Sequence, residues 1–512
     1  MLAAISRLTE IITWLHAVAP AAQLSSDSRS IAAGDVFFAY PGDAADGRQY
    51  IPHAIERGAQ AVVYDDKGGF NWNGAWDVPH QAVTDLRKIA GQIANAYYSR
   101  PDAGMFTVAV TGTNGKTSCS QWLGRALSQM GEPTAVIGTL GVGMFERDQR
   151  GQFEATGYTT PDAVLLQRKL AQCRDAGARA LAIEASSIGL HQGRLTGTHF
   201  DVALFTNFTR DHLDYHGSMA TYEAAKTMLF DWPGLQHAVV NLDDEMGLRL
   251  IQRLKRKASP ASLIGYTLSG RAVDGVATLH ATDIRASHAG MVFQLDSMFG
   301  STQVKTQLVG QFNVSNILGI VGVLLAKGTP WRVAIEIVES LAAVPGRMQQ
   351  LGDQNTPLVV IDYAHTPDAL EKTLSALREV AQQRSGQLWC VFGCGGDRDS
   401  GKRAPMGAVS AAADHVIVTS DNPRSENATD IIAQILEGLN LAKIMQTTPH
   451  VIEDRAAAIL WAVKHAAKSD VILLAGKGHE TYQEIKGRKL PFLDADHAAL
   501  ALAARATMKG TN

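Results

Sequence analysis

One short segment places glycines, a lysine and two hydroxyl side chains in the order that a phosphate-binding loop requires. It reads Val110-Thr111-Gly112-Thr113-Asn114-Gly115-Lys116-Thr117-Ser118. An apolar run precedes it and an amphipathic helical pattern follows it, which is the strand–loop–helix setting of such loops. The helix start would face phosphates, Lys116 would neutralise β and γ oxygens, and Thr117 would hold Mg²⁺. We therefore predict a nucleoside triphosphate site, although Val110 replaces the usual first glycine.

Two further segments supply acidic and imidazole groups. Glu184 follows the apolar run 180–183, and a carboxylate at a strand end near a phosphate loop is a candidate Mg²⁺ ligand. A helix-capping or solvated acid is the alternative. The loop 206–217 gathers Arg210, Asp211, His212, Asp214 and His216. Further along, Lys226 lies on a helical face, where the local pattern by itself predicts a solvated lysine.

Polar or glycine-rich loops follow four apolar runs in the last third of the chain. They are Asp362–Pro367, Gly393–Asp399, Asp421–Arg424 and Gly476–Glu480. Ligands of open parallel sheets bind at the carboxyl ends of the strands, so strand-end loops of this kind indicate a binding edge. Any one loop alone is equally compatible with a structural turn. Together they predict chemistry between this edge and the edge that carries the phosphate loop.

The elements that position these loops fall into three predicted domains, because a domain usually takes about 100–200 residues and the chain has 512. Residues 1–103 mix short helices and strands as a small α/β domain. Residues 104–345 alternate strands and helices around the phosphate loop, which predicts a mostly parallel sheet, with an antiparallel addition at 275–312. Residues 346–512 repeat the alternation as a doubly wound, Rossmann-like domain. The predicted fold class is α/β.

Individual elements follow from the apolar periodicity. Buried strands are predicted at 105–110, 180–185, 202–206, 238–242, 291–295, 304–308, 358–361, 388–392, 416–418 and 471–474. Helices are predicted at 162–176, 313–327 and 367–380. Nearly every strand of the last two domains thus leads into polar or glycine-rich residues, which is where the candidate site residues lie.

Composition argues against several classes of partner. The formal net charge of -3 gives no electrostatic reason to expect nucleic acid or an anionic membrane. No apolar run reaches the roughly 18 residues of a membrane span, and the first residues read as an amphipathic helix rather than a signal peptide. The 4 cysteines lack the spacing of a zinc site. We therefore expect a cytoplasmic protein with reduced, buried thiols.

Together these segments resemble those of the Mur ligase family, over the whole chain. The phosphate loop, Thr206–His216 and Asp362–Pro367 carry the resemblance. It implies a UDP-substrate-binding domain at 1–103, an ATPase domain at 104–345 and an amino-acid-binding domain at 346–512. It also implies ATP-driven amide formation through an acyl phosphate. The segments that resemble the member adding the third residue of the peptidoglycan stem peptide are Asp27-Ser28-Arg29, Asp46-Gly47-Arg48, Tyr222–Lys226 and Gly476–Glu480.

The resemblance also implies roles for individual residues. Catalytic positions are matched by Lys116, Lys226, His212 and Glu184, and Mg²⁺ positions by Thr117, Glu184, His212 and a carbamylated Lys226. The nucleotide site is matched by Gly112–Ser118, Asn316, Arg347 and Asp362. Contacts to the UDP-linked peptide are matched by Ser28, Thr159, Thr160, Ser186, Gln192 and Arg194. The amino-acid site is matched by Arg398, Asp421, Asn422, Pro423, Arg424, Gly476 and Glu480. Near the UDP-linked substrate, Tyr158 and Asp43-Ala44 depart from the family pattern.

The implied substrates are ATP, UDP-MurNAc-L-Ala-D-Glu and meso-diaminopimelate, and we expect a monomer. Arg424 favours diaminopimelate over L-lysine, because the two differ by a distal carboxylate, for which Arg is the natural bidentate partner. An L-lysine-adding ligase of the same family stays an alternative. A folylpolyglutamate synthase shares the ATPase design, but the domain of about 100 residues ahead of the phosphate loop argues against it. A nucleotide-dependent switch without turnover is a further alternative, and no G-x-G-x-x-G follows a strand to indicate a dehydrogenase.

Overall fold

The computed structural model describes residues 2–43, 45–147, 149–257, 259, 261–287, 290–353, 355–442 and 449–509. Its first part is a parallel sheet in the order β1-β2-β3-β4. The elements are α1 (Leu2–Val18), β1 (Leu24–Ser25), β2 (Val36–Ala39), α2 (Ile51–Glu56), β3 (Ala61–Asp65), β4 (His80–Val83) and α3 (Leu86–Tyr97). Phe38 and Val63 pack against Leu15 and Ile93, so α1 and α3 cover one face of this sheet.

The central part is one long sheet in the order β15-β14-β13-β12-β11-β10-β5-β9-β6-β7-β8. The run from β13 to β6 is parallel, and both ends of the sheet are antiparallel. The strands are β5 (Phe106–Thr111), β6 (Thr134–Gly138), β7 (Gly141–Glu146), β8 (Gln149–Arg150), β9 (Ala180–Glu184), β10 (Val202–Phe205), β11 (His237–Asn241), β12 (Ser262–Thr267), β13 (Ala277–Ser287), β14 (Gly290–Ser297) and β15 (Gly300–Thr306). The antiparallel addition predicted for 275–312 is confirmed, whereas the hairpin at the β8 edge was not predicted.

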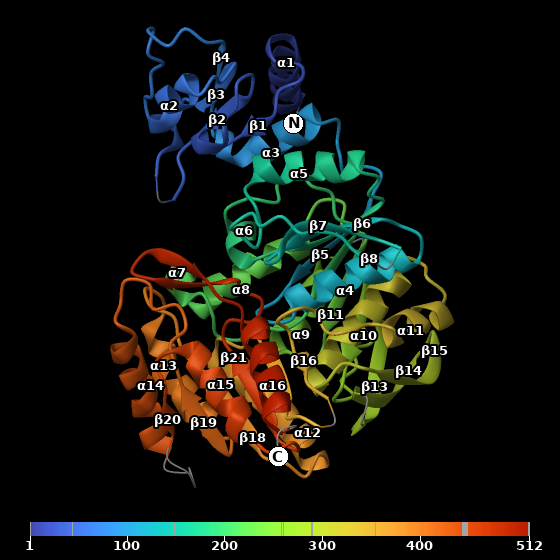
Figure 1. Cartoon of the computed structure of the whole chain (residues 1–512). Helices are drawn as coiled ribbons and strands as arrows, with labels where there is room; N and C mark the ends of the chain where they lie inside the picture. Colours follow the sequence, from blue (N-terminus) through green and yellow to red (C-terminus); the bar gives the residue numbers. More distant parts are fainter. Residues whose placement is uncertain are drawn as a thin grey trace.

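Helices cover both faces of the central sheet (Figure 1). The helices of this part are α4 (Lys116–Gln129), α5 (Ala163–Asp175), α6 (Ser187–His191), α7 (Leu213–His216), α8 (Met219–Thr227), α9 (Glu245–Arg256), α10 (Gln311–Ala326) and α11 (Trp331–Glu339). Successive side chains of a strand point to opposite faces. On β5, Val110 accordingly joins the core under α4 and α10, while Ala109 joins the core on the opposite face.

The C-terminal part has its own sheet in the order β16-β17-β21-β18-β19-β20, parallel except at β16. The strands are β16 (Gln349–Leu351), β17 (Leu358–Asp362), β18 (Leu388–Phe392), β19 (His415–Val418), β20 (His450–Val451) and β21 (Val471–Ala475), with a hairpin of β22 (Tyr482–Ile485) and β23 (Arg488–Pro491). The helices are α12 (Pro367–Gln383), α13 (Arg403–Ser410), α14 (Ala428–Ala442), α15 (Arg455–His465) and α16 (Asp494–Lys509). Each face of this sheet has a separate apolar core.

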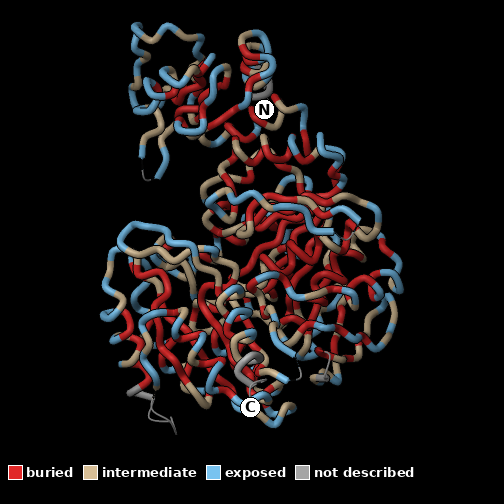
Figure 2. The backbone as a smooth tube through the Cα atoms, viewed as in Figure 1, coloured by how far each residue is buried: buried red, intermediate tan, exposed pale blue. Residues whose placement is uncertain are grey.

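The predicted α/β class with three parts is confirmed, and the buried backbone concentrates in the sheets of each part (Figure 2). The strand predicted at 304–308 is shifted, because β15 begins at Gly300 and ends at Thr306, whereas the limits of the other predicted strands agree to within about two residues, as at 180–185 and β9. The domain boundaries at 103/104 and 345/346 stay predictions. All four cysteines, Cys119, Cys173, Cys390 and Cys394, are free and buried, as expected. No helix within the described ranges is both long and apolar enough to cross a bilayer.

Candidate active site between the central and C-terminal parts

The phosphate loop leaves β5 between the ends of β9 and β10, which are its neighbours in the sheet. Gly112 has φ of 151°, and a Cβ there would lie 1.9 Å from the hydroxyl of Thr206. Gly115, with φ of 88°, precedes the first turn of α4. Glycine is therefore required at both positions. Lys116 Nζ donates to the carbonyl oxygens of Gly112 and Thr113, at 2.9 and 2.8 Å, so its side chain curls back over the loop.

Glu184 ends β9 beside the start of α4 and is 1% exposed. Its Oε2 accepts from the Thr117 hydroxyl at 3.1 Å, and its Oε1 accepts from the Thr139 backbone N–H at 2.8 Å. Arg347 Nη2 in turn donates to the Thr117 hydroxyl at 3.1 Å. Mg²⁺ in nucleotide sites usually takes one or two carboxylates together with substrate phosphates. This hydroxyl and carboxylate fit that donor pattern.

A cavity of about 230 Å³ opens above the phosphate loop and reaches the C-terminal part. Its walls include the predicted nucleotide residues Thr113, Asn114, Gly115, Lys116, Thr117, Ser118, Asn316, Arg347 and Asp362, and also Thr159, Glu184, Ser186 and His212. Asn114 Nδ2 donates to Asp368 Oδ2 at 3.3 Å, which joins the loop to α12. Burial raises the pKa of Asp362, and the nearby Arg347 guanidinium opposes that rise. Two sheets thus contribute one cavity, as the strand-end loops predicted.

The loop after β10 brings His212 to the wall of this cavity. His212 has φ of 51°, and its Nε2 lies 3.5 Å from Asp211 Oδ2. Burial lowers the pKa of His212, and Asp211 partly opposes that shift. The imidazole is therefore held towards its neutral form, which is the form that can act as a metal ligand. The described residues contain no group of three or more His, Cys, Asp or Glu placed to hold a metal.

Lys226 lies beneath the phosphate loop rather than in solvent, so the expectation from its local pattern is wrong. Its side chain is 1% exposed, because α8 turns this face against the loop. Lys226 Nζ donates to the Gly112 carbonyl oxygen at 2.7 Å and lies 4.5 Å from the centre of the Tyr222 ring. Burial lowers the pKa of Lys226 well below its ordinary value, and the nearby Lys116 lowers it further. Both effects shift this side chain towards the uncharged amine, against the opposing charges of Asp211 and Asp244.

Most residues predicted to contact the UDP-linked peptide form a path from the first part of the chain to the cavity. Gln192 Nε2 donates to Asp43 Oδ2 at 2.5 Å, and Arg194 Nε donates to Gln192 Oε1 at 2.7 Å. Arg194 also donates to the Thr160 carbonyl oxygen at 2.8 Å. The Thr160 and Ser186 hydroxyl oxygens are 2.8 Å apart. The path ends at the cavity, which Ser186 lines.

Ser28 belongs to the first part of the chain, where its hydroxyl is 3.1 Å from His53 Nδ1. Tyr158, which departs from the family pattern, is 59% exposed, and the Arg194 guanidinium lies 4.8 Å from its ring centre. Asp43 is paired with Arg87 at 2.5 Å as well as with Gln192. Tyr158 and Asp43 therefore each contact a residue predicted to bind the UDP-linked substrate, and Ala44 lies outside the described residues.

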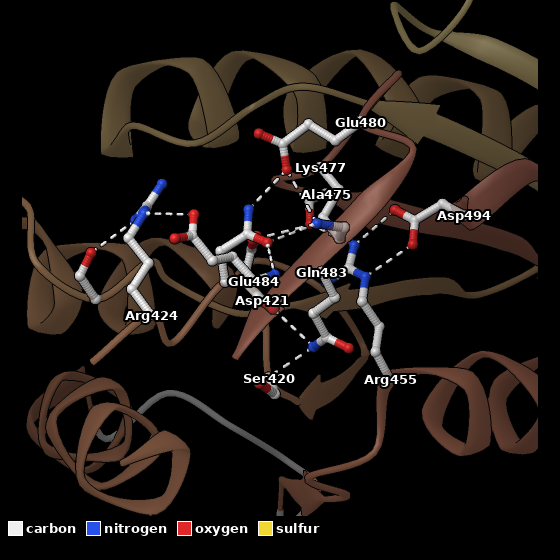
Figure 3. A network of polar contacts seen from close by, with 12 residues as sticks. Ser420, Asp421, Arg424, Arg455, Ala475, Lys477, Glu480, Gln483, Glu484 and Asp494 are labelled. Carbon is white, nitrogen blue, oxygen red and sulfur yellow. Dashed lines mark hydrogen bonds and ion pairs between the residues drawn. The ribbon is translucent and has the colours of Figure 1, made fainter. Parts of the chain in front are cut away.

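Of the residues predicted to bind the amino acid, Asp421, Arg424 and Glu480 lie in the polar network of Figure 3, and none of the predicted set lines the cavity. Asn422 Nδ2 donates to Glu480 Oε2 at 2.8 Å. Arg424 has φ of 54°, and its Nη1 donates to the Gly396 carbonyl oxygen at 2.6 Å. Arg398 is exposed on the neighbouring loop. The strand-end loops of β19 and β21 thus meet, as the sequence predicted.

Tyr363 connects the cavity with the loop after β21. Its ring centre is 4.3 Å from the Arg347 guanidinium and 5.4 Å from the ring of His479, which follows β21. The loops of Tyr363 and Lys477 were predicted to lie at strand ends, but no role was predicted for either residue. It also left unassigned Thr139, Asn207 and His365, which line the cavity. In the sequence, these residues could be recognised only by their position in polar loops at strand ends. Their side-chain contacts are visible only in the three-dimensional structure.

Comparison with known proteins agrees with this arrangement. Residues 21–98 match the Mur ligase family catalytic domain, residues 110–324 the Mur ligase middle domain, and residues 346–478 the Mur ligase glutamate ligase domain. The UDP-N-acetylmuramoyl-L-alanyl-D-glutamate–2,6-diaminopimelate ligase of Janthinobacterium sp. (strain Marseille) is 67% identical over 505 residues, covering 99% of this chain and 98% of that protein. The ligase of the same name from Pseudomonas aeruginosa is 46% identical, covering 94% of this chain and 95% of that protein.

Solved structures give the same result. A structure of a UDP-N-acetylmuramoyl-L-alanyl-D-glutamate–2,6-diaminopimelate ligase matches with a TM-score of 0.66 and 36% identity, covering 94% of this chain and 95% of that one. The Mycobacterium tuberculosis folylpolyglutamate synthase matches with a TM-score of 0.60 and 17% identity, covering 77% of this chain and 92% of that one, which shows a shared fold alone. The match at 67% identity, together with the domain matches along the sequence, establishes that this chain belongs to the Mur ligase family.

Proposed function

We propose that this chain is an ATP-dependent ligase that adds meso-2,6-diaminopimelate to UDP-N-acetylmuramoyl-L-alanyl-D-glutamate in the cytoplasm. The observation that carries the proposal is the cavity shared by the phosphate loop and the C-terminal strand ends, with the Arg424 loop beside it. The relatives that match over almost the full length carry the name of this activity. An L-lysine-adding ligase would catalyse the same reaction with a different amino acid. Substitution of Arg424 therefore distinguishes the two proposals.

The first chemical step is phosphoryl transfer from ATP. A free carboxylate oxygen of the D-glutamyl residue bonds to the γ-phosphorus, the bond from that phosphorus to the ADP oxygen breaks, and an acyl phosphate forms. Catalysis of this step is mainly positioning and charge stabilisation. Lys116 would supply positive charge to the transferring phosphate. Its ammonium group would have to move away from the carbonyl oxygens of Gly112 and Thr113, which it contacts in this structure. Thr117, Glu184 and His212 would hold Mg²⁺, which when bound neutralises phosphate oxygens.

The second step forms the amide. The uncharged amine of diaminopimelate attacks the acyl carbon, loses its proton, and the carbon–oxygen bond to phosphate breaks as phosphate leaves. Binding both partners at fixed positions replaces a bimolecular encounter with an oriented one. The path from Asp43 to Ser186 would align the UDP-linked peptide with the γ-phosphate. The loops after β19 and β21 would present the amine from the other side.

Lys226 is proposed to act as a carbamate formed with CO₂. Its buried amine faces the Gly112 carbonyl oxygen and forms no ion pair with a carboxylate of the described residues. Burial and the nearby Lys116 lower the pKa of Lys226 towards the uncharged amine, the form that reacts with CO₂, and the more distant carboxylates of Asp211 and Asp244 oppose this shift. The product is an anion, so it could accompany a metal ion where an ammonium group would repel it. The amine lies beneath the phosphate loop, within reach of the phosphate site.

The amino-acid assignment is tested at Arg424. In Arg424→Ala we expect the KM for meso-diaminopimelate to rise by roughly 30-fold or more, because the distal carboxylate loses its charged partner, a loss of about 2–5 kcal/mol at about 1.4 kcal/mol per tenfold. Arg424→Lys should recover part of the affinity, since an ammonium group cannot form the bidentate contact. Steady-state kinetics with each substrate varied in turn measure these values.

Lys489, an exposed lysine of β23, provides the matched control. Lys489→Ala should leave all KM values unchanged, and the KM values for ATP and the UDP-linked peptide should hardly move in Arg424→Ala. An unchanged KM for meso-diaminopimelate in Arg424→Ala would contradict the assignment of this loop and leave the ligase assignment standing.

A further inference from the structure

Resting on the proposed function, we infer that Lys477 is a positioning residue of the amino-acid site, which orients Glu480 and Asn422 so that one Glu480 oxygen stays available to an ammonium group of the incoming amino acid. Lys477 lies at the centre of the network drawn in Figure 3. Its side chain is fully buried, at 0% exposure. A lysine is almost never fully buried unless it is paired, so this one has a specific set of partners.

The Lys477 ammonium group faces three oxygen atoms of the two loops. Nζ lies 2.9 Å from Glu480 Oε2, 3.2 Å from Asn422 Oδ1 and 3.8 Å from Asp421 Oδ1. The first two contacts are hydrogen bonds, and the third is an ion pair at longer range. Burial raises the pKa of Asp421, and Lys477 is the main group opposing that rise. Lys477 therefore ties the loop after β19 to the loop after β21.

The contacts of Lys477 fix the orientation of the Glu480 carboxylate. Its Oε2 accepts from both Lys477 and Asn422, at 2.9 and 2.8 Å. Within the described part of the chain, no hydrogen bond reaches Glu480 Oε1. The side chain is 19% exposed, so the carboxylate is anchored on one oxygen and accessible to a ligand. A carboxylate held in this way is preorganised for an ammonium group, and diaminopimelate carries two.

The backbone that carries Lys477 is fixed from behind. Gly476 has φ of 106°, and a Cβ there would lie 2.6 Å from Asp421 Oδ2, so glycine lets that carboxylate approach. Arg455 forms a bidentate pair with Asp494 at 2.8 and 2.7 Å, and both side chains are fully buried. The same guanidinium donates to the Ala475 carbonyl oxygen at 2.9 Å, at the end of β21. Arg455 therefore stabilises the backbone at the end of β21, directly before the turn that contains Lys477.

The test compares Lys477→Met, Glu480→Gln and the double variant. If Lys477 acts through Glu480, Lys477→Met should raise the KM for meso-diaminopimelate by about tenfold or more, as expected for loss of contacts to a charged group. The KM for ATP should stay within about twofold. The double variant should be no worse than Glu480→Gln within about twofold, because the two effects share one contact. Lys477→Arg should restore part of the affinity.

Arg378→Met is the matched control, because Arg378 pairs with Asp414 at 2.5 Å at the opposite ends of the strands. It should lower the thermal midpoint without changing the KM for the amino acid. A wild-type KM in Lys477→Met, or effects that multiply in the double variant, would overturn the inference. If Lys477→Met does not fold, the double variant, which leaves Glu480 uncharged, still gives the comparison with Glu480→Gln. Wild-type enzyme that ligates L-lysine and not diaminopimelate would refute the proposed substrate, and the same variants would then be compared with L-lysine.

Discussion

Replacing Lys116 with alanine should reduce turnover by about 10²–10³-fold or more, because removal of one preorganised charge stabiliser typically costs that much and phosphoryl transfer depends on such groups. The fold should survive. The half-buried side chain contacts two loop carbonyl oxygens, and the glycines, not the lysine, shape the loop. Phosphate release with saturating ATP, UDP-linked dipeptide and meso-diaminopimelate measures the effect, with the thermal midpoint as the check on folding.

Lys327 provides a control for the removal of a lysine outside the site. It pairs with Glu132 at 2.9 Å and follows α10. Lys327→Ala should keep wild-type turnover. If Lys116→Ala released phosphate at close to the wild-type rate, the assignment of residues 110–118 as the phosphate loop would be wrong.

Replacing Lys226 with alanine should reduce turnover by about 10–100-fold or more, the usual cost of losing a group that supports a metal site. The proposed anion is a carbamate, so high bicarbonate should raise the activity of CO₂-depleted wild-type enzyme and should not raise that of the variant. A short-chain carboxylate should restore part of the activity of Lys226→Ala. Burial lowers the pKa of Lys226, so the uncharged amine that reacts with CO₂ is present at lower pH than in an ordinary lysine. Carbamate formation should therefore persist to lower pH than it would at a solvated lysine.

Carbon-13 bicarbonate gives a direct readout, because a carbamate carbon should be visible by NMR in the wild-type protein and absent in Lys226→Ala. Lys169→Ala is the control, since Lys169 is also largely buried but is already paired with Glu154 at 2.7 Å. Fully active wild-type enzyme with a free ammonium group at Lys226 would contradict the proposal.

The phosphate loop and the strand-end loops could be predicted from the sequence because their signals are local. An apolar run, a glycine-rich loop and an amphipathic helix follow one another within residues 105–130, and β5 and α4 lie where this order predicts. The carboxyl-edge rule then brings Asp362, which ends β17, to the same cavity as Thr117, although the two are far apart in the sequence. Arg347 also lines the cavity, but it precedes β16, and only the family resemblance pointed to it. The family resemblance supplied the roles that the pattern could not.

The burial of Lys226 and Lys477 could not be predicted locally, because it depends on partners distant in the sequence. Lys226 is enclosed by the Gly112 region, and Lys477 by Asn422 from another strand end. A lysine on a helical face or between two glycines looks the same in sequence whether it is solvated or paired. The hairpin of β7 and β8 was missed for a related reason, since β8 is two residues long and exposed, without apolar periodicity.

The central claim is tested most directly by amino-acid-dependent phosphate release in the presence of ATP and UDP-MurNAc-L-Ala-D-Glu, with meso-diaminopimelate compared against L-lysine and the products identified by mass. The account predicts phosphate release with meso-diaminopimelate, matched by one new UDP-linked tripeptide per phosphate, and little release with L-lysine or without the UDP-linked dipeptide. Equal use of the two amino acids would contradict the diaminopimelate assignment. Phosphate release without any amide product would contradict the ligase assignment itself.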